Sequence, residues 1–279
     1  MRSTINHLIQ LQELSLVRDE QRSLRGPKAD LGDLNEAIGQ LADSLEPVVR
    51  TIYLRLSKKD RIVVAPMHAG KCSMCGMGLA ISQVQAVKQC KVVVTCPSCA
   101  RILYDSDGPT WSGSRPRNPA AGTKAGIARF SAPSLMVPDL KASTPEEAIA
   151  ELAGTMKTAG FVETTDKLVA GAMVRENMLG TAVGHALAFP HVRGVEGGGL
   201  ALAFGISRKG IEWSGSDGSP ARFVFFSAIP TATSVFYLKL LAGLAESYTK
   251  EANRKAALAA DSPETLWKAL AKATRWTVK

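Results

Sequence analysis

The sequence predicts an α/β protein in which a helical hairpin and a small β ribbon precede a larger layered domain. Three observations lead to this expectation. Apolar residues recur at helical spacing near the N-terminus, short β-type runs accompany a group of cysteines, and helix and strand signals alternate after about residue 135. With 279 residues, 46% of them hydrophobic, the chain is long enough for two domains and too apolar to be disordered throughout.

Composition also bounds the setting and the partners. Lys and Arg number 34 against 25 Asp and Glu, so the net charge of +9 indicates an anionic partner without locating it. No apolar run approaches the length of a membrane-spanning helix, and residues 1–19 lack the features of a secretory signal. We therefore expect a cytoplasmic protein whose five cysteines are metal ligands, catalytic groups or buried thiols rather than disulfides.

Residues 1–62 are expected to form a helical hairpin or a short coiled coil. Between residues 34 and 52, apolar side chains recur in alternating steps of four and three, at Leu34, Ile38, Leu41, Leu45, Val48 and Ile52. This heptad seam predicts one continuous helix, with Asp33 and Glu36 as its capping pair. A looser stripe over residues 5–17 predicts the partner helix, and Gly26-Pro27 separates the two. The seam is typical of simple core packing, and it also permits a homodimer through the hairpin.

The middle of the chain divides into a ribbon and a linker. Residues 63–104 hold all five cysteines, with β-type runs at 62–64 and 92–95, which predicts a small β ribbon. Residues 105–134 are rich in Gly, Pro and scattered charge. Such a segment has too little apolar surface to offset the entropy of ordering, so we expect a flexible linker at a domain boundary.

Residues 135–279 are predicted to form the layered α/β domain. Thr144 and Glu147 form a capping box with Pro145 at the first helical position, which predicts a helix that ends at Gly160. The other expected helices cover 166–177 and 234–249, with a last one opened by Ser262, and the expected strands cover 187–189, 200–204 and 223–228.

Four cysteines form two Cys-x-x-Cys knuckles separated by 20 residues: Cys72, Cys75, Cys96 and Cys99. This spacing places four thiolates on two tight turns, where they can converge tetrahedrally on zinc, with Gly76 and Ala100 as the small residues that such turns favour. Disulfides or an iron–sulfur cluster are the alternatives. Because four protein ligands leave no open position, the zinc would be structural.

The other polar residues of the ribbon carry weaker signals. Cys90 has no partner at ligand spacing and is expected to be a packed thiol, and His68 is a remote candidate ligand. Residues 58–101 hold seven Lys and Arg against Asp60, a surplus of six, or of four once zinc and its thiolates are counted. This basic ribbon permits nucleic acid or another anion as a partner, while the lack of interleaved aromatic residues gives no support for base stacking.

The ribbon also resembles a known family. The knuckle Cys72 to Cys75 and the run from Cys96 to Tyr104 are similar to bacterial zinc-ribbon proteins in which the ribbon follows a coiled-coil hairpin. The resemblance covers residues 1–104, and it suggests nucleic acid as a partner, although that family has no established activity. The hairpin of this chain is much shorter than is usual in that family.

The run from Arg175 to His191 holds a second candidate site. His191 follows Pro190 at the exit of a short apolar strand, beside Gly194 and Gly197 to Gly199, whose backbone N–H groups can hold an anion. The near-neutral pKa of a histidine makes it a usable nucleophile. From residue types alone the signal is weak, because an isolated histidine is more often a packed or surface residue.

A second resemblance involves this run. Residues 135–275 are similar to the fructose/mannitol-type enzyme IIA domain of the bacterial phosphotransferase system, including its nitrogen-regulatory branch. The motif positions are Arg175, Glu176, Thr181, Gly184, Ala188, Pro190 and His191, and the similarity continues through 211–213, 217–220, 223–230 and 238–242. It implies an enzyme IIA type 2-like mixed sheet flanked by helices, with His191 accepting a phosphoryl group from the carrier HPr and passing it to a IIB domain or a regulatory target. Arg175 would stabilise the phosphate charge, and Thr181 and Gly184 would contribute to its binding.

Two positions depart from the family pattern. Tyr237 stands where many members carry a second histidine, and it cannot hold a positive charge. His185 could replace that histidine if it points the same way; otherwise it is a solvent-facing turn residue. The resulting hypothesis is a regulatory phosphocarrier with a structural zinc ribbon. The alternatives are a ribbon-based nucleic-acid or protein binder with an unphosphorylated scaffold, and a soluble IIA component of sugar uptake.

Overall fold

The structure, a computed structural model, describes residues 2–25, 31–105, 126–162, 164–193, 195, 200–214, 218–230 and 234–278. It divides into two compact units, Met1–Asp107 and Gly108–Lys279, each described here by itself. Most of the expected linker, and the glycines at 194 and 197–199, lie outside the described residues. Within the described ranges, no helix is both long and apolar enough to cross a membrane.

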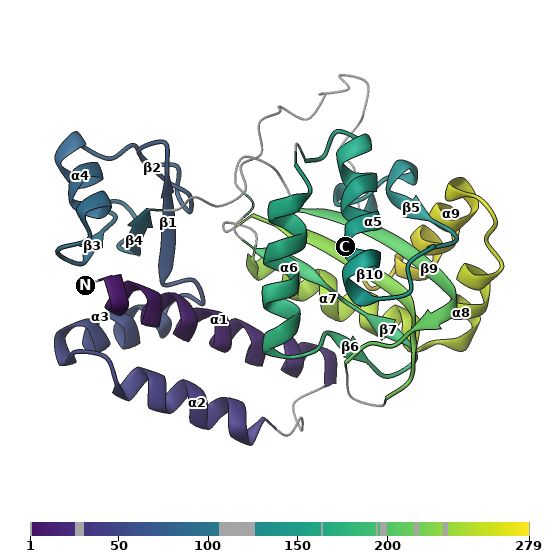
Figure 1. The fold of residues 1–279 in the computed structure, drawn as a ribbon, viewed down its shortest axis with the longest axis horizontal. Coiled ribbons are helices and arrows are strands. Elements are labelled where there is room, and N and C mark those ends of the chain that lie inside the picture. The colour runs from purple at the N-terminus through teal and green to yellow at the C-terminus, as the bar shows by residue number, and fades with distance from the viewer. Residues whose placement is uncertain are drawn as a thin grey trace. The chain divides into compact units, whose positions relative to one another are not determined.

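Three helices, rather than a simple hairpin, open the first unit (Figure 1): α1 (Arg2–Arg25), α2 (Gly32–Asp43) and α3 (Pro47–Ser57). The prediction of one helix over 34–52 is wrong, because a proline suits the first turn of a helix but not its interior, and Pro47 starts a new one. The change of direction moves the buried face. Val48 of the expected seam is 72% exposed, while Val49 and Tyr53 are buried in its place.

The cysteine-bearing segment forms a four-stranded sheet with one helix: β1 (Val64–His68), β2 (Lys71–Cys72), α4 (Ile81–Gln89), β3 (Val94–Thr95) and β4 (Ile102–Asp105). The strand order is β2-β1-β4-β3, with β1 and β4 parallel and the other pairs antiparallel. The β-type runs therefore did predict a small sheet. Helix α4, which has only one buried residue, gave too weak an apolar pattern to be foreseen.

This small sheet separates two apolar cores of the first unit. Val64 and Ile102 pack with the helices α1 to α3. Their neighbours Ala65 and Leu103 pack with Cys72 and other residues on the opposite face, where the cysteines lie. The alternation follows from the pleat of a strand, in which successive side chains point to opposite faces. The helices and the cysteine cluster thus share one sheet as their common support.

A buried amide ties α1 to this sheet. The Gln12 side chain is 6% exposed, and its Nε2 donates to the Val64 carbonyl at 3.0 Å. The backbone N–H groups of Val63 and Val64 both donate to Gln12 Oε1, each at 2.7 Å. One side chain therefore satisfies three backbone groups at the start of β1, and burying these groups without partners would cost free energy.

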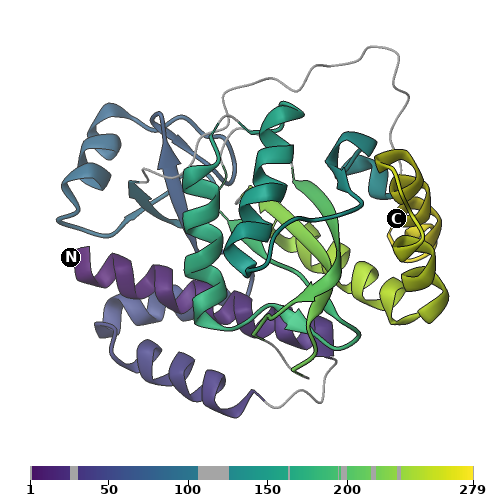
Figure 2. The ribbon, with the colours of Figure 1, turned by 45° about the vertical axis from the view of Figure 1, so that its right-hand side comes forward.

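The second unit is a mixed sheet with helices on both faces (Figures 1 and 2). Its strands are β5 (Met136–Val137), β6 (Ala182–Val183), β7 (Leu187–Ala188), β8 (His191–Arg193), β9 (Ala201–Ile211) and β10 (Ala221–Ile229). Its helices are α5 (Pro145–Thr158), α6 (Asp166–Met178), α7 (Ser234–Thr249), α8 (Glu251–Leu258) and α9 (Pro263–Thr274). The order is β5-β9-β10-β7-β6, with β8 also paired to β10. The expected α/β class is confirmed.

Local signals placed several elements of this unit correctly. The Thr144 hydroxyl accepts from the Glu147 backbone N–H at 3.2 Å and Glu147 accepts in return from the Thr144 N–H, so the expected capping box starts α5. The expected linker, however, reaches too far. The described part of it forms the 3-10 helices Gly126–Arg129 and Pro133–Leu135, and Ile127 is buried. Its few apolar side chains suffice to anchor it, although its average composition predicts a flexible segment.

Candidate functional sites: a cysteine cluster and a buried histidine

The four cysteines of the two knuckles converge in the first unit. Their Sγ atoms all lie within 4.8 Å of one another. The Sγ atoms of Cys72 and Cys99 are 3.8 Å apart, and those of Cys75 and Cys96 are 3.6 Å apart. A tetrahedral zinc ion with Zn–S bonds of about 2.3 Å requires sulfur–sulfur distances of about 3.8 Å. These two distances match a tetrahedral site, and all four sulfur atoms are close enough together to bind one ion.

The backbone of each knuckle explains the small residue that follows it. Gly76 N donates to the Cys72 carbonyl at 2.8 Å, and Ala100 N donates to the Cys96 carbonyl at 2.9 Å. Both closing residues have left-handed φ angles, +74° for Gly76 and +61° for Ala100. Gly76 adopts this conformation freely because it has no Cβ atom, whereas Ala100 adopts it at a steric cost.

The electrostatics of the thiols suit a site that exchanges protons for a metal. Burial raises the pKa of Cys72 and of Cys99 above the usual thiol value. For Cys75, burial also raises the pKa, but hydrogen bonds from the Met77 backbone and from the neighbouring thiols lower it to about 7. Metal binding must therefore displace protons from the more buried thiols, since the ligand is the thiolate.

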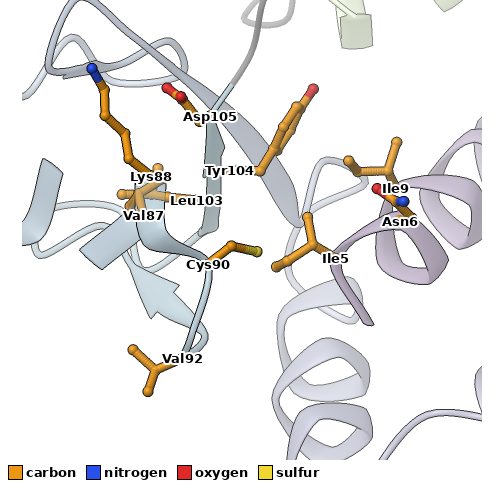
Figure 3. Close-up of a pocket in the computed structure, with 10 residues that line it drawn as sticks. All are labelled: Ile5, Asn6, Ile9, Val87, Lys88, Cys90, Val92, Leu103, Tyr104 and Asp105. Carbon is orange, nitrogen blue, oxygen red and sulfur yellow. The ribbon is translucent and has the colours of Figure 1, made fainter. Parts of the chain in front are cut away.

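Cys90 and His68 lie apart from this cluster. Among the described residues, the ligand side chains that converge are the four knuckle cysteines, and His68 is exposed at the end of β1. Cys90 caps α4 and lines a cavity of about 460 Å³ between α1, α4 and β4, where its sulfur faces Ile5 (Figure 3). Its partial burial agrees with the expectation of a packed thiol.

Two of the basic residues of the ribbon lie next to acidic residues of the first unit. Arg101 forms an ion pair with Asp60, and its Nε donates to the Ile62 carbonyl at 2.8 Å. Arg61 lies 3.6 Å from an Asp19 carboxylate oxygen. Both arginines thus have acidic partners within the unit, although Arg61 is also exposed. The exposed lysines of this segment are Lys58, Lys59, Lys71, Lys88 and Lys91.

In the second unit, His191 begins β8 and pairs in register with Ser227 of β10. Its side chain is 2% exposed, and its Nδ1 lies 3.1 Å from the Phe189 carbonyl oxygen. A carbonyl can only accept a hydrogen bond, so this contact places a proton on Nδ1. In a neutral ring the lone pair is then on Nε2, which is the tautomer that a nucleophilic Nε2 requires.

Tyr237 and Arg193 complete the surroundings of this histidine. The Tyr237 ring of α7 lies 5.1 Å from the His191 ring, centroid to centroid, which places the tyrosine where the family comparison suggested a second histidine. The Arg193 guanidinium lies 5.6 Å from the centroid of the same tyrosine ring. Sequence reasoning missed Arg193. Its signal was available, because the second residue after His191 in a strand shares its face.

Arg175 and Glu176 stabilise the end of α6. Arg175 Nη1 donates to the Leu179 carbonyl at 2.8 Å, and its side chain is buried. Glu176 accepts from Thr181 N at 2.7 Å, from the Thr181 hydroxyl at 2.6 Å and from Trp213 Nε1 at 2.8 Å. The expected role of Thr181 in phosphate binding is not what the structure shows, because its hydroxyl is committed to Glu176.

Helix α6 packs closely on the strand that carries His191. A Cβ atom added to Gly171 would lie 2.9 Å from Cγ2 of Val192, so the helix approaches β8 at a position without a side chain. Val192 points to the face opposite that of His191 and Arg193, since side chains alternate along a strand. The two faces of β8 are therefore covered by α6 and α7 respectively.

The structure does not bring His185 to His191. His185 is exposed in the turn between β6 and β7, where it and Ala186 have left-handed φ angles of +69° and +60°. Leu187 pairs with Phe223 and His191 with Ser227, so even Leu187 is about 13 Å from His191 along the strand path. This register argues against the expected catalytic role of His185. It also argues against Gly184, in the same turn, as a phosphate ligand.

The mixed sheet and the buried histidine lie in a segment that matches a known family. Residues 130–273 match the family model described as "Phosphoenolpyruvate-dependent sugar phosphotransferase system, EIIA 2", which covers more than half of the chain. The chain belongs to this family. Residues 71–103 match the C4-type zinc ribbon domain, which is the segment that carries the cysteine cluster.

Several known proteins are similar to the second unit. The fructose-specific EIIA component of Haloferax volcanii is 30% identical over 129 residues, which is 46% of this chain and 84% of that protein. A nitrogen regulatory protein of Bradyrhizobium diazoefficiens is 30% identical over 118 residues, 41% of this chain and 74% of that protein. The fructose-specific EIIABC component of Bacillus subtilis is 27% identical, and the match spans 46% of this chain but only 20% of that protein. Among solved structures, the nitrogen regulatory protein IIA-Ntr of Neisseria meningitidis is 20% identical, with a TM-score of 0.47 and coverage of 52% of this chain and 98% of that one.

Proposed function

We propose that the second unit is a phosphocarrier that accepts a phosphoryl group on Nε2 of His191 from the phosphocarrier protein HPr. The observation that carries the proposal is the contact between Nδ1 and the Phe189 carbonyl, because it fixes the nucleophilic tautomer in a member of the EIIA 2 family. Phosphoryl transfer asks little covalent chemistry of a protein and depends on positioning and charge neutralisation. The fixed imidazole supports the positioning, and Arg193, whose guanidinium lies over the Tyr237 ring that also contacts His191, offers a cation nearby.

We further propose that the carrier is regulatory. The similarity to a nitrogen regulatory protein supports this role, with a IIB domain or a regulatory target protein as the next acceptor. A soluble component of fructose-type sugar uptake is the competing proposal, supported by the similarity to fructose-specific EIIA. In both cases the exchange with HPr takes place in the cytoplasm.

The direct test is a phosphotransfer assay with the full chain. Enzyme I, HPr and radiolabelled phosphoenolpyruvate should label the wild type at one histidine. His191→Ala should take up no label, while His185→Ala, which removes the exposed histidine of the β6–β7 turn, should label as the wild type does. Equal labelling of His191→Ala and the wild type would reject the proposal.

For the first unit we propose a structural zinc ion bound by Cys72, Cys75, Cys96 and Cys99. The sulfur–sulfur distances near 3.8 Å support zinc, and the four ligands leave no coordination position for water or substrate. Zinc would hold the two knuckles together below the small sheet. Metal analysis of protein purified without added zinc should give about one zinc per chain.

A second candidate function for the ribbon is binding of nucleic acid or of an acidic protein. The exposed lysines of the ribbon favour an anionic partner. If the partner is a nucleic acid, retention should weaken steeply with salt, and reversing the charge at Lys88 and Lys91 should reduce it. Retention that is independent of salt and unchanged by Lys88→Glu with Lys91→Glu would reject this candidate.

A further inference from the structure

We propose that Arg193 is a cation that binds the phosphoryl group on His191, in addition to the Arg175 that the family resemblance implies, and that the Tyr237 ring holds the Arg193 guanidinium in position. This inference rests on the proposed phosphocarrier function and adds a residue that the motif comparison did not supply. Two observations meet in it. Arg193 follows His191 at the next position on the same strand face, and both side chains contact one tyrosine ring from α7.

The strand geometry brings the two side chains together. Residues two apart in a strand have Cα atoms about 7 Å apart and project from the same face. The pairing of His191 with Ser227 and of Arg193 with Ile229 shows that β8 keeps this regular register through both positions. An arginine side chain spans that distance, so its guanidinium can reach a phosphoryl group attached to the neighbouring imidazole.

Tyr237 gives the arginine a defined place. A guanidinium over an aromatic face is attracted by the negative charge of the ring, and this attraction grows when the pair is shielded from water. Tyr237 is 1% exposed, and its ring lies 5.6 Å from Arg193 Cζ and 5.1 Å from the His191 ring centroid. The ring is a platform shared by the nucleophile and the cation, which explains how a neutral tyrosine can serve at this position.

The chemistry matches an arginine in this role. The Nε2 lone pair of His191 forms the new bond to phosphorus while the bond from phosphorus to the donor nitrogen breaks and the donor ring leaves with that electron pair. Each ring keeps its own N–H, so a neutral acceptor becomes a protonated phosphoimidazole as a protonated phosphoimidazole donor becomes neutral. The transferring group carries negative charge on its oxygens throughout, and a guanidinium can bind two of them at once.

The test compares arginine variants of the full chain. Phosphate uptake is measured from HPr and, independently of any carrier, from phosphoramidate, a small phosphoryl donor for histidine. Arg193→Gln should lower the rate of uptake about 10- to 100-fold and shorten the lifetime of the phosphohistidine, while Arg193→Lys should fall between it and the wild type. The matched control is Arg275→Gln, because Arg275 also lies over an aromatic ring, Trp276 at 5.0 Å, and should label as the wild type does.

Tyrosine variants separate the platform from a hydrogen bond. Tyr237→Phe keeps the ring and should keep uptake within about twofold, whereas Tyr237→Leu should slow it, and adding Arg193→Gln to Tyr237→Leu should slow it little further. A strong loss in Tyr237→Phe would overturn the platform role, since it would assign the effect to the hydroxyl. Thermal unfolding of each variant checks that the fold persists.

The outcomes distinguish this inference from the proposed function. If the wild type is labelled at His191 and Arg193→Gln is labelled equally fast with an equally stable product, the inference is overturned and the phosphocarrier proposal stands. If neither donor labels the wild type at His191, the proposed function fails, and the inference fails with it. If Arg193→Gln does not fold, wild-type rates and lifetimes in the folded Arg193→Lys variant overturn the requirement for a guanidinium.

Discussion

The cysteine cluster comes from one short stretch between residues 72 and 99, whereas the surroundings of His191 join a helix near residue 171, two strands and a second helix at Tyr237. Each cysteine knuckle is closed by its own backbone hydrogen bond, so its geometry is local. The histidine acquires its neighbours only when β8, β10 and α7 are assembled. Local spacing therefore specifies the first site, and topology specifies the second.

Loss of one cysteine should have the largest effect and tests how local the first site is. Cys96→Ser removes a buried ligand, so the zinc content should fall from about one ion per chain to near zero. Cys90→Ser, which alters the packed thiol outside the cluster, should keep its zinc. Metal analysis and labelling of His191 are measured on the same samples. Normal zinc content in Cys96→Ser would show that the cluster is not the metal site.

Removal of Glu176 tests how far the second site depends on its supports. Glu176→Ala leaves the Thr181 N–H and hydroxyl and the Trp213 N–H without their buried acceptor, so unfolding free energy should fall by about 3–5 kcal/mol. Denaturant unfolding measures the loss. The matched control is Glu146→Ala, an exposed acid at the start of α5, which should change stability by less than about 1 kcal/mol. Equal effects of the two substitutions would show that the Glu176 network contributes nothing.

A glycine pair gives the smallest and most local test. Gly171→Ala places a methyl group 2.9 Å from Val192, so it should destabilise the second unit by about 1–3 kcal/mol. Gly154→Ala, in α5 with no atom within 4 Å of the added carbon, should instead stabilise it by about 0.5–1 kcal/mol through helix propensity. Thermal unfolding decides the sign. Stabilisation by both alanines would mean that α6 does not need its close approach to β8.

The same contrast explains what the sequence could predict. Paired knuckles identify the four cysteines that converge, because a tetrahedral metal site requires such residues at that spacing. The Thr144 cap and the α7 helix likewise follow from signals within a few residues. The wrong prediction of one helix over residues 34–52 shows the limit of such local patterns. A heptad count takes no account of Pro47, which starts a new helix.

Around His191, the family motif supplied candidate residues, but it did not show which partners their side chains contact. Thr181 is close to the site in sequence, yet its hydroxyl is used by Glu176, and His185 is separated from His191 by the length of the β7–β8 path. Arg193 was overlooked because the family motif ends at the histidine. The partner of each polar side chain depends on the strand register and on the helix that covers each face of the sheet. A single sequence motif predicts neither of these.

The Gln12 amide has a consequence for how the first unit unfolds. Because one side chain of α1 hydrogen-bonds three backbone groups where β1 begins, helix and ribbon cannot separate without exposing all of these groups at once. Amide protons of α1 and of β1 should therefore exchange with solvent in one cooperative opening rather than in two. Removing the metal with a chelator should then speed the exchange of amide protons in α1, although α1 contains none of the four cysteines.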